Sequence, residues 1–412
     1  MTSQNRRLTM KDNQAKYPQL RFKGFTDPWV QRQVGDFLTE SRIPGSNGAI
    51  SKKLTVKLWG KGVIPKETVT DGSEATKYYV RKAGQFMYGK LDFLHAAFGI
   101  VPENLDGYES TLDSPAFDIA NLNSTFLMDT VMRKSFYLYQ GNIANGSRKA
   151  KRIHVDTFSD MPIDVPTLDE QDKIGYFFDQ LDNLIAANQR KLDLLKEQKK
   201  SYLQKMFPKN GAKVPELRFA GFADAWEERK LQEVLRERNN QQPQSMEYPL
   251  VSFTVENGVT PKTDRYEREQ LVVGDKSSKK YKVTVLNDIV YNPANLKFGA
   301  ISRNKYGNAV FSPIYITFLV NNDVTTPGFI EMFVTRNDFI KRALKYQQGT
   351  VYERQSVSPT DLLAMNVYLP GKSEQEKIGS FFQQLDETIA LHQRKLEKLQ
   401  ELKKGYLQKM FC

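Results

Sequence analysis

The sequence predicts an α+β protein in which two tandem mixed α/β modules are each followed by a long helix. Three observations carry this prediction. The chain of 412 residues is an internal duplication. Each copy ends in a segment with the heptad spacing of a long helix, and the stretch before it alternates strand-like and helical patterns. At roughly 100–200 residues per domain, the length also fits two to four domains.

Two repeated motifs mark the duplication. The segment Pro18–Trp29, PQLRFKGFTDPW, returns as Pro215–Trp226, PELRFAGFADAW, after a shift of 197 residues. The segment Glu170–Phe207 returns as Glu374–Phe411 after a shift of 204 residues, with roughly two thirds of the paired positions identical. The stretches between these motifs share almost nothing in order. Each half therefore has an opening motif and a closing helix that both halves share. Between them lies a region, called the middle below, whose sequence differs between the halves.

The closing segments are predicted to be two helices that bury each other's apolar stripes. Large side chains recur in alternating steps of four and three, which is the seam of a coiled coil. Neither segment contains an internal proline, and both are rich in good helix formers. At 1.5 Å per residue, each would make a rod of about 55 Å. The seam residues are Leu181, Ile185, Leu192, Leu195, Leu385, Ile389, Leu396 and Leu399.

Polar residues indicate the register and the start of these helices. Asn188 and His392 occupy the same seam position, where a polar pair can fix the alignment of two helices. An ordinary core asparagine and an ordinary core histidine are an equally good interpretation. Asp169 and Ser373 are the predicted N-caps, each ahead of an acidic first turn.

The middles are predicted to be mixed β-structure with some helix. Helical segments are expected at 328–346 and near 123–138. Lys77–Val80, KYYV, has a weak echo in Lys280–Val283, KYKV, which favours one fold carrying two divergent surfaces. The strand-like runs are 78–80, 85–88, 250–254, 288–291 and 314–320.

Composition predicts a soluble, cytoplasmic protein with a polyanionic partner. The net charge is +12, of which +6 falls in residues 1–167 and +4 in residues 208–371. Basic globular blocks suggest nucleic acid, although many other soluble proteins are mildly basic. No apolar run approaches the roughly 18 residues that span a membrane, and the first sixteen residues lack the apolar core of a secretory signal. The single cysteine, Cys412, excludes a disulfide framework and a cysteine-based zinc site.

Signatures of catalysis are scarce. The sequence contains no GxxxxGK[ST] phosphate loop, and no GxGxxG opens a helix after a strand. His95, His154 and His392 lie in different segments without the spacing of metal ligands or of a catalytic triad. Asn292–Asn295, NPAN, faintly resembles the Asn-Pro-Pro-aromatic motif of amino methyltransferases, but it lacks the second proline and the aromatic residue. A strand-ending turn is the better interpretation, and we predict no catalytic residue, metal site or cofactor in this chain.

Basic loops in the two middles are the candidate DNA contacts. The loop 146–152, GSRKAKR, holds four cations behind a glycine, and the corresponding loop of the other half is 349–354. Further basic clusters lie at 276–282 and 303–305. Such loops can neutralise phosphates and read base edges, although most charged loops are simply solvated. The candidates are Ser147, Arg148, Lys149, Lys151, Arg152, Lys279, Lys280, Arg303, Lys305, Thr350, Tyr352 and Arg354.

The doubled pattern resembles the specificity subunits of type I restriction–modification systems. The resemblance rests on the opening motif PxLRFxGFxxxW and on the closing motifs EQxKIGxFFxQLD, QRKL and KKxYLQKMF, and it covers nearly the whole chain. It implies two target recognition domains, 17–167 and 209–371. It also implies two spacer helices, within 168–208 and 372–412, that pair as an antiparallel coiled coil. Residues 1–16 would form a disordered tail.

The resemblance also implies a function. Each target recognition domain would read one half of a split, asymmetric sequence in double-stranded DNA. The chain itself would not be an enzyme. It would recruit two modification subunits, which methylate adenine with S-adenosylmethionine, and restriction subunits, which cleave DNA with ATP and Mg²⁺. Two alternatives stay open: a coiled-coil scaffolding protein whose modules never touch DNA, and a fused methyltransferase, which the missing cofactor motifs disfavour.

Overall fold

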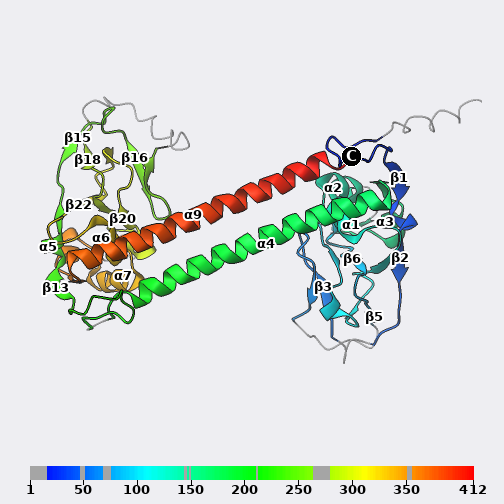
Figure 1. Ribbon diagram of the computed structural model, residues 1–412, viewed down its shortest axis with the longest axis horizontal. Coiled ribbons are helices and arrows are strands. Elements are labelled where there is room, and N and C mark those ends of the chain that lie inside the picture. The colour runs from blue at the N-terminus through cyan, green and yellow to red at the C-terminus, as the bar shows by residue number, and fades with distance from the viewer. Residues whose placement is uncertain are drawn as a thin grey trace, which may run out of the picture. The chain divides into compact units, whose positions relative to one another are not determined.

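The computed structural model describes residues 16–46, 52–67, 76–142, 146–147, 150–209, 212–262, 279–349 and 355–412, and for residues 146, 147, 150 and 151 it describes the backbone alone. The chain forms two compact units. The first unit combines residues 1–190 with residues 394–412, and the second contains residues 191–393. Part of each long helix therefore belongs to each unit (Figure 1). The predicted disordered tail falls outside the described residues, apart from Lys16. Among the helices described, none has the length and apolar character needed to cross a membrane.

A four-stranded antiparallel sheet with the strand order β2-β9-β6-β7 is the centre of the first unit. Successive residues of a strand face opposite sides of a sheet. Phe86 and Tyr88 of β6 accordingly lie in one hydrophobic cluster and Met87 in another, so the sheet is buried on both faces. The pairs β1-β12, β3-β4, β5-β8 and β10-β11 complete the unit. Its strands are β1 (Val30–Gln33), β2 (Leu38–Ser41), β3 (Leu54–Val56), β4 (Val63–Pro65), β5 (Tyr79–Val80), β6 (Phe86–Tyr88), β7 (Phe98–Ile100), β8 (Glu109–Ser110), β9 (Ala116–Ile119), β10 (Gly146–Ser147), β11 (Ala150–Lys151) and β12 (Pro162–Val165).

Helices cover the face of this sheet that carries Phe86. Phe126 and Phe158, from two short helices, share a cluster with Phe178 of the first long helix and with Phe411, which follows the second. The helices are α1 (Ser124–Val131), α2 (Lys134–Gly141), α3 (Val155–Ser159), the N-terminal part of α4 (Leu168–Lys205) and the C-terminal part of α9 (Lys372–Lys409), with the 3-10 turns η1 (Val34–Asp36), η2 (Phe93–His95) and η3 (Glu103–Leu105).

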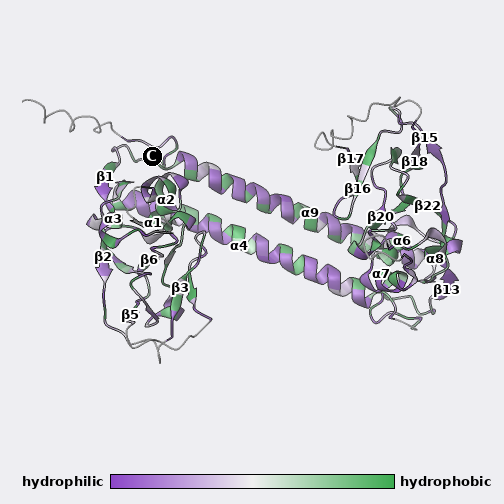
Figure 2. Ribbon diagram, turned by 180° about the vertical axis from the view of Figure 1, so that it is seen from behind, coloured by the Kyte–Doolittle hydropathy of each residue, from purple (hydrophilic) through white to green (hydrophobic). Residues whose placement is uncertain are grey.

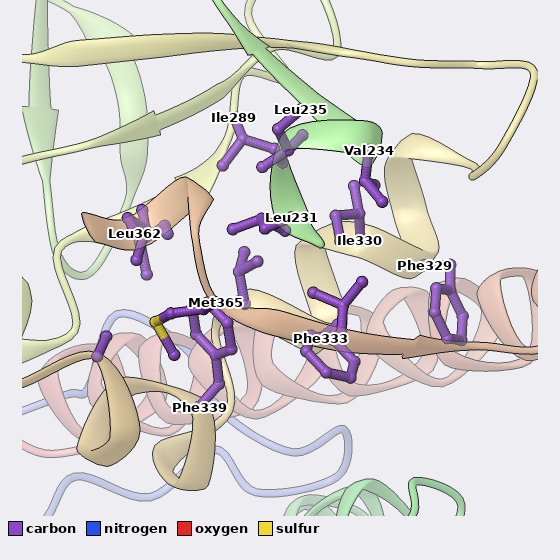
Figure 3. Close-up of a cluster of buried hydrophobic side chains, with 14 of the residues drawn as sticks. Leu231, Val234, Leu235, Ile289, Phe329, Ile330, Phe333, Phe339, Leu362 and Met365 are labelled. Atoms are coloured by element: carbon purple, nitrogen blue, oxygen red, sulfur yellow. The ribbon is translucent and has the colours of Figure 1, made fainter. Parts of the chain in front are cut away.

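The second unit repeats this arrangement with the strand order β14-β22-β19-β20. Ile289 of β19 lies in one hydrophobic cluster and Val290 in another. Figure 3 shows the first of these clusters, with Ile289 beside Leu235. A three-stranded sheet, β15-β18-β21, and the pairs β13-β23 and β16-β17 complete the unit. Its strands are β13 (Glu227–Lys230), β14 (Leu235–Glu237), β15 (Gln241–Gln242), β16 (Val251–Thr254), β17 (Gly258–Pro261), β18 (Tyr281–Thr284), β19 (Ile289–Tyr291), β20 (Ile301–Arg303), β21 (Ala309–Phe311), β22 (Ile316–Val320) and β23 (Asn366–Leu369).

The predicted strands and helical segments are confirmed, and each helical segment contains more than one helix. Each of the five strand-like runs contains a strand that starts one or two residues late and ends where predicted: β5, β6, β16, β19 and β22. Segment 328–346 divides into α6 (Pro327–Val334), α7 (Asn337–Ala343) and η6 (Leu344–Tyr346), and segment 123–138 divides into α1 and α2. The remaining helical elements of the second unit are α5 (Leu231–Val234), η5 (Leu296–Phe298), α8 (Pro359–Leu363) and the other parts of α4 and α9.

A tertiary contact explains both helix breaks. Arg133 and Arg336 stand at the breaks with extended backbone, at ψ 137° and 140°. The guanidinium of Arg133 lies 4.9 Å from the ring centre of Phe411, and that of Arg336 lies 4.7 Å from Phe207. Arginine over an aromatic face is an attractive pair. The break therefore depends on a phenylalanine that is remote in sequence and that local periodicity cannot register.

The turn predicted at Asn292–Asn295 is confirmed. It directly follows β19, and the Asn292 side-chain oxygen accepts a hydrogen bond of 3.1 Å from the N–H of Ala294. Asparagine commonly closes turns in this way, by bonding to backbone two residues on. The motif thus has a local structural explanation.

The two long helices pack against each other in the first unit. The ring of Phe177 in α4 meets that of Tyr406 in α9 edge-on, with the centres 5.1 Å apart. Nearby, the Lys403 Nζ atom donates to both carboxylate oxygens of Asp182, at 2.6 and 2.7 Å. The beginning of α4 therefore lies beside the end of α9.

The second unit contains the same contacts with the two helices exchanged. Phe381 of α9 meets Tyr202 of α4 at 5.2 Å, and Lys199 of α4 bonds to Asp386 of α9. These residues are the repeat equivalents of the four in the first unit, after the shift of 204. The beginning of each helix lies beside the end of the other, so the expected antiparallel pairing is confirmed.

All eight assigned seam residues are buried or half-buried, and Leu192 is only 1% exposed. Figure 2 shows α4 and α9 as largely hydrophilic ribbons with recurring hydrophobic patches. Both N-cap predictions are wrong, because α4 begins at Leu168 and α9 at Lys372, one residue before Asp169 and Ser373. Those two residues therefore lie inside the first turns.

Candidate nucleic-acid interface

A buried ion pair joins each opening motif to its own closing helix. The guanidinium of Arg21 donates to both carboxylate oxygens of Glu170, at 2.6 and 2.7 Å. Arg218 binds Glu374 in the same way, at 2.7 and 2.6 Å. Both glutamates are at most 1% exposed, and the hydrogen bond to the glutamate raises the pKa of each arginine. Two parallel bonds also fix the angle between the partners.

The glutamine that follows each glutamate holds the first helix of the middle. The Gln171 side-chain oxygen accepts a bond of 3.0 Å from the N–H of Asn123, whose own side chain caps α1. Gln375 accepts a bond of 3.1 Å from the N–H of Thr326, which caps α6. The Glu-Gln pair thus anchors each middle to its frame, a role that its exact recurrence in both halves signals but that spacing alone does not reveal.

The end of each long helix anchors the opening motif of the other half. The ring centre of Phe411, from the second closing segment, lies 5.9 Å from that of Trp29 in the first unit. The ring centre of Phe207, from the first closing segment, lies 5.8 Å from that of Trp226 in the second unit. The frame, meaning the opening motifs and the closing helices, therefore positions both middles through the same set of contacts.

The predicted basic loop of the first module is partly described. Gly146–Ser147 pairs with Ala150–Lys151 as an antiparallel hairpin. Arg148, Lys149 and the side chains of Ser147 and Lys151 lie outside the described residues. The Arg152 side chain is 47% exposed, and its Nη1 atom lies 3.3 Å from Asp113 Oδ1.

Arg152 adjoins a second cation that the sequence analysis did not select. The N–H of the next residue, Ile153, donates to the Lys90 carbonyl at 3.0 Å, and the N–H of Lys90 donates to the Asp113 carbonyl at 2.9 Å. Partial burial lowers the pKa of the Lys90 ammonium group. Arg152, Lys90 and Asp113 are therefore neighbours on one surface.

The candidate DNA contacts of the second module lie in separate parts of that module. Lys279 and Lys280 are exposed just before β18, and the Lys279 Nζ atom lies 5.4 Å from the ring centre of Tyr281. Arg303 and Lys305 share the carboxylate of Glu331, each at 2.9 Å. Arg303 is 24% exposed and Lys305 61% exposed, so Lys305 is the more accessible of the two. Thr350, Tyr352 and Arg354 lie outside the described residues.

One arginine of the first module is an interior residue. Arg81 is fully buried and donates to the Ser110 hydroxyl at 2.8 Å and to the Ser41 carbonyl at 2.9 Å. Burial lowers its pKa to about 10. It joins the ends of β2 and β8 from inside, and a DNA phosphate cannot reach it.

The β3–β4 hairpin of the first module is the feature that sequence reasoning missed. Residues 52–66 contain five lysines and no acidic residue. At its tip, Trp59 is 54% exposed, and its ring meets that of His95 edge-on at 5.6 Å. The signal was present in the sequence as a run of lysines around an aromatic residue, but the contact with His95 is a property of the fold.

The contacts of the two units define a class of protein. One fold occurs twice on one frame, the frame contacts are duplicated, and each copy carries its own exposed and largely basic loops. Such a protein presents two different binding surfaces from one scaffold.

Comparisons with known proteins agree with this class. The chain matches the family described as Type I restriction modification DNA specificity domain over residues 114–197 and 224–401, more than half of its length. The chain therefore belongs to this family. A solved structure of the type I restriction–modification S subunit from M. genitalium is similar over 96% of this chain and 99% of that one, at 11% identity and a TM-score of 0.58. A second solved structure, described as the structural basis underlying complex assembly and conformational transition of the type I R-M system, is similar over 93% of this chain and 97% of that one. The two are 15% identical, and the TM-score is 0.50. These two likenesses show the fold.

Proposed function

We propose that this chain gives a type I restriction–modification complex its DNA specificity, with each module reading one half of a bipartite, asymmetric site. The observation that carries the proposal is the duplicated frame around two different middles. A surface that is the same in both copies suits one partner bound twice, whereas a surface that differs suits two different ligands. Family membership favours this function over that of a scaffold without a DNA role.

The partners are double-stranded DNA, two modification subunits and the restriction subunits. A groove of about 540 Å³ in the first unit supports a docking role for the frame, because Leu20 and Leu402 line it and are 41% and 42% exposed. In the second unit, Leu217 of the other opening motif and Leu194 of α4 are 39% and 47% exposed. Exposed apolar residues on a shared frame are suited to protein–protein contact.

The chain is not an enzyme in this proposal. S-adenosylmethionine, ATP and Mg²⁺ belong to the partner subunits, since the sequence carries no phosphate loop and no cofactor-binding glycine motif. Purified alone, the chain should transfer no methyl groups and cut no DNA. Methylation by a contaminant-free preparation of this chain would overturn that part.

Exchange of one middle tests the proposal. Replacing residues 240–366 with the middle of a related protein should change one half of the methylated sequence, as read by sequencing methylated adenines in the genome. The matched exchange of residues 43–162 should change the other half. If either exchange alters both halves or neither, the two modules do not read separate half-sites.

A further inference from the structure

The tip of the β3–β4 hairpin of the first module, where Trp59 lies, has the properties of a ligand-binding element. Trp59 lies between Lys57 and Lys61, both exposed, and neither lysine makes an ion pair with any residue that the structure describes. The hairpin segment 52–66 contains five lysines and no acidic residue, and four of these lysines are exposed, whereas Lys53 is buried. Single exposed apolar residues are common on protein surfaces, but an exposed indole at the centre of a purely cationic hairpin is complementary to a polyanion with apolar faces.

The tip is held in a strained conformation by its own fold. Trp59 has φ +60° and Ala96 has φ +49°, and these are two of only four non-glycine residues with positive φ in the described ranges. The N–H of Trp59 donates to the His95 carbonyl at 2.8 Å, and the N–H of Gly60 donates to the Ala96 carbonyl at 2.9 Å. Positive φ is uncommon for a bulky residue. Backbone strain of this kind persists where the surroundings impose it, and it clusters at binding sites.

The second module has the same scaffold without the same chemistry. Its η5 turn corresponds to η2, and a Cβ atom placed on Gly299 would lie 3.9 Å from Val255 at the tip of β16–β17. Val255 and Phe298 are 50% and 65% exposed there. Residues 249–262 contain one glutamate and one lysine, so this hairpin is neutral. The tip is therefore a position where the two modules differ both in side chains and in the connection itself, since residues 57–62 join β3 to β4 and residues 255–257 join β16 to β17.

We propose that Trp59, supported by His95, is a DNA-contacting residue of the first module, with its indole against base edges and Lys57 and Lys61 against the phosphates on either side. This rests on the proposed function. Apolar side chains read features such as the thymine methyl group in the major groove, and lysines that neutralise phosphates make binding depend on salt. Trp59 is then a specificity-determining residue, and its counterpart in the second module differs because that module reads a different half-site.

The chain contains a built-in probe for this contact. Of its three tryptophans, Trp29 and Trp226 are 4% and 1% exposed, so Trp59 alone is accessible. Titrating the full-length chain with duplex DNA that carries its methylation site should quench the Trp59 emission and protect it from acrylamide. The W59F variant identifies the signal, because it removes only that emission, and its ring should keep the affinity within about threefold.

Two further variants separate binding from folding. W59G should keep or raise the Tm, since glycine tolerates positive φ, yet weaken DNA binding about tenfold, as expected for one lost base contact. K57Q/K61Q should lower the slope of log K against log salt by about 1.8, at 0.9 for each phosphate contact. Y176A, at an exposed aromatic residue on α4, is the matched control and should bind as the parent does.

The outcomes distinguish this inference from the proposed function. If the parent binds its site but Trp59 emission is unchanged and W59G binds as tightly, Trp59 does not contact DNA, and the two-module function stands. If the parent binds no duplex DNA either alone or with its methyltransferase partner, the proposed function fails first.

Discussion

In the frame, the pair Arg21–Glu170 recurs as Arg218–Glu374 with nearly the same distances, whereas the β3–β4 and β16–β17 hairpins share their antiparallel pairing and little of their chemistry. Both regions descend from one duplication. The difference between them shows which contacts are the same in both halves of the protein and which have diverged. In the proposed function, the frame meets the same partner in both halves, whereas the two hairpins meet different half-sites.

The conserved frame contacts are buried and charged, which makes them sensitive to any change. Glu170 and Glu374 are almost fully enclosed, so a substitution of either arginine partner leaves a charge without compensation. The hairpin tips are exposed, and their side chains can vary at little cost to stability. Divergence is therefore possible at the tips and restricted in the frame.

The strongest test of the frame is to remove the two arginines separately. Arg21→Ala and Arg218→Ala should each destabilise their unit by about 3–5 kcal/mol, because a buried glutamate is left unpaired. Urea denaturation of both variants beside the parent measures this effect. Arg21→Lys and Arg218→Lys keep the charge but lose the two-bond geometry, and they should cost less. A clear difference between the two units would mean that the repeated contact does not have a repeated role.

A buried acid in the first middle has no acidic counterpart in the second and gives the second test. Asp129 of α1 is 8% exposed, and its equivalent in α6 is the apolar Met332. Burial raises the pKa of Asp129 to about 7, against the attraction of Lys403 and together with Asp182 and Asp179. Its folded pKa lies above the unfolded value, so its contribution to stability is full below about pH 4 and is lost as the pH rises through 7.

Asp129→Asn should therefore stabilise the first unit by about 2–4 kcal/mol at pH 8, with the gain vanishing below pH 4. Thermal unfolding between pH 4 and 8 measures the difference. Asp160→Asn, at an exposed residue just after α3, is the control and should leave the pH dependence as it is. An unchanged pH slope in Asp129→Asn would show that this carboxyl is not the group responsible.

Much of the fold could be predicted because repetition and periodicity are local properties of a sequence. The two motifs located the frame, and the five strand-like runs ended where their strands end. The helix breaks could not be predicted, since Arg133 turns the chain to meet Phe411, which is 278 residues away. Sequence alone also could not show that Trp59 docks on His95, because no pattern joins a hairpin tip to a turn of another segment.

The candidate site was predicted less completely, for a physical reason. Charged residues in loops look alike in a sequence whether or not they are paired. Arg303 and Lys305 both meet Glu331, which no local spacing indicates. Of the twelve candidates, the structure gives the side-chain surroundings of Arg152, Lys279, Lys280, Arg303 and Lys305 only, and the roles of all twelve stay predictions.

The basic loop of the first module gives the third test. Neutralising Lys149, Lys151 and Arg152 together should weaken binding to all DNA sequences and reduce the salt slope by about 2.7, because three phosphate contacts are lost. Filter binding at several salt concentrations, with specific and unrelated duplexes, measures both effects. A loss confined to one base pair, at about 1–3 kcal/mol, would instead identify a base-reading residue in this loop.

The smallest expected effect concerns Lys305 in the second module. Its ion pair with Glu331 is on the surface, and surface pairs contribute about 0–1 kcal/mol, so Lys305→Gln should leave the free energy of unfolding within about 1 kcal/mol of the parent. If the second module binds phosphate through this residue, the salt slope should fall by about 0.9. Lys230→Gln, at an exposed lysine of β13, should leave the slope unchanged. A Lys305→Gln variant with the parent's slope would assign Lys305 to Glu331 alone, and among the exposed candidate lysines that the structure describes in the second module it would leave Lys279 and Lys280.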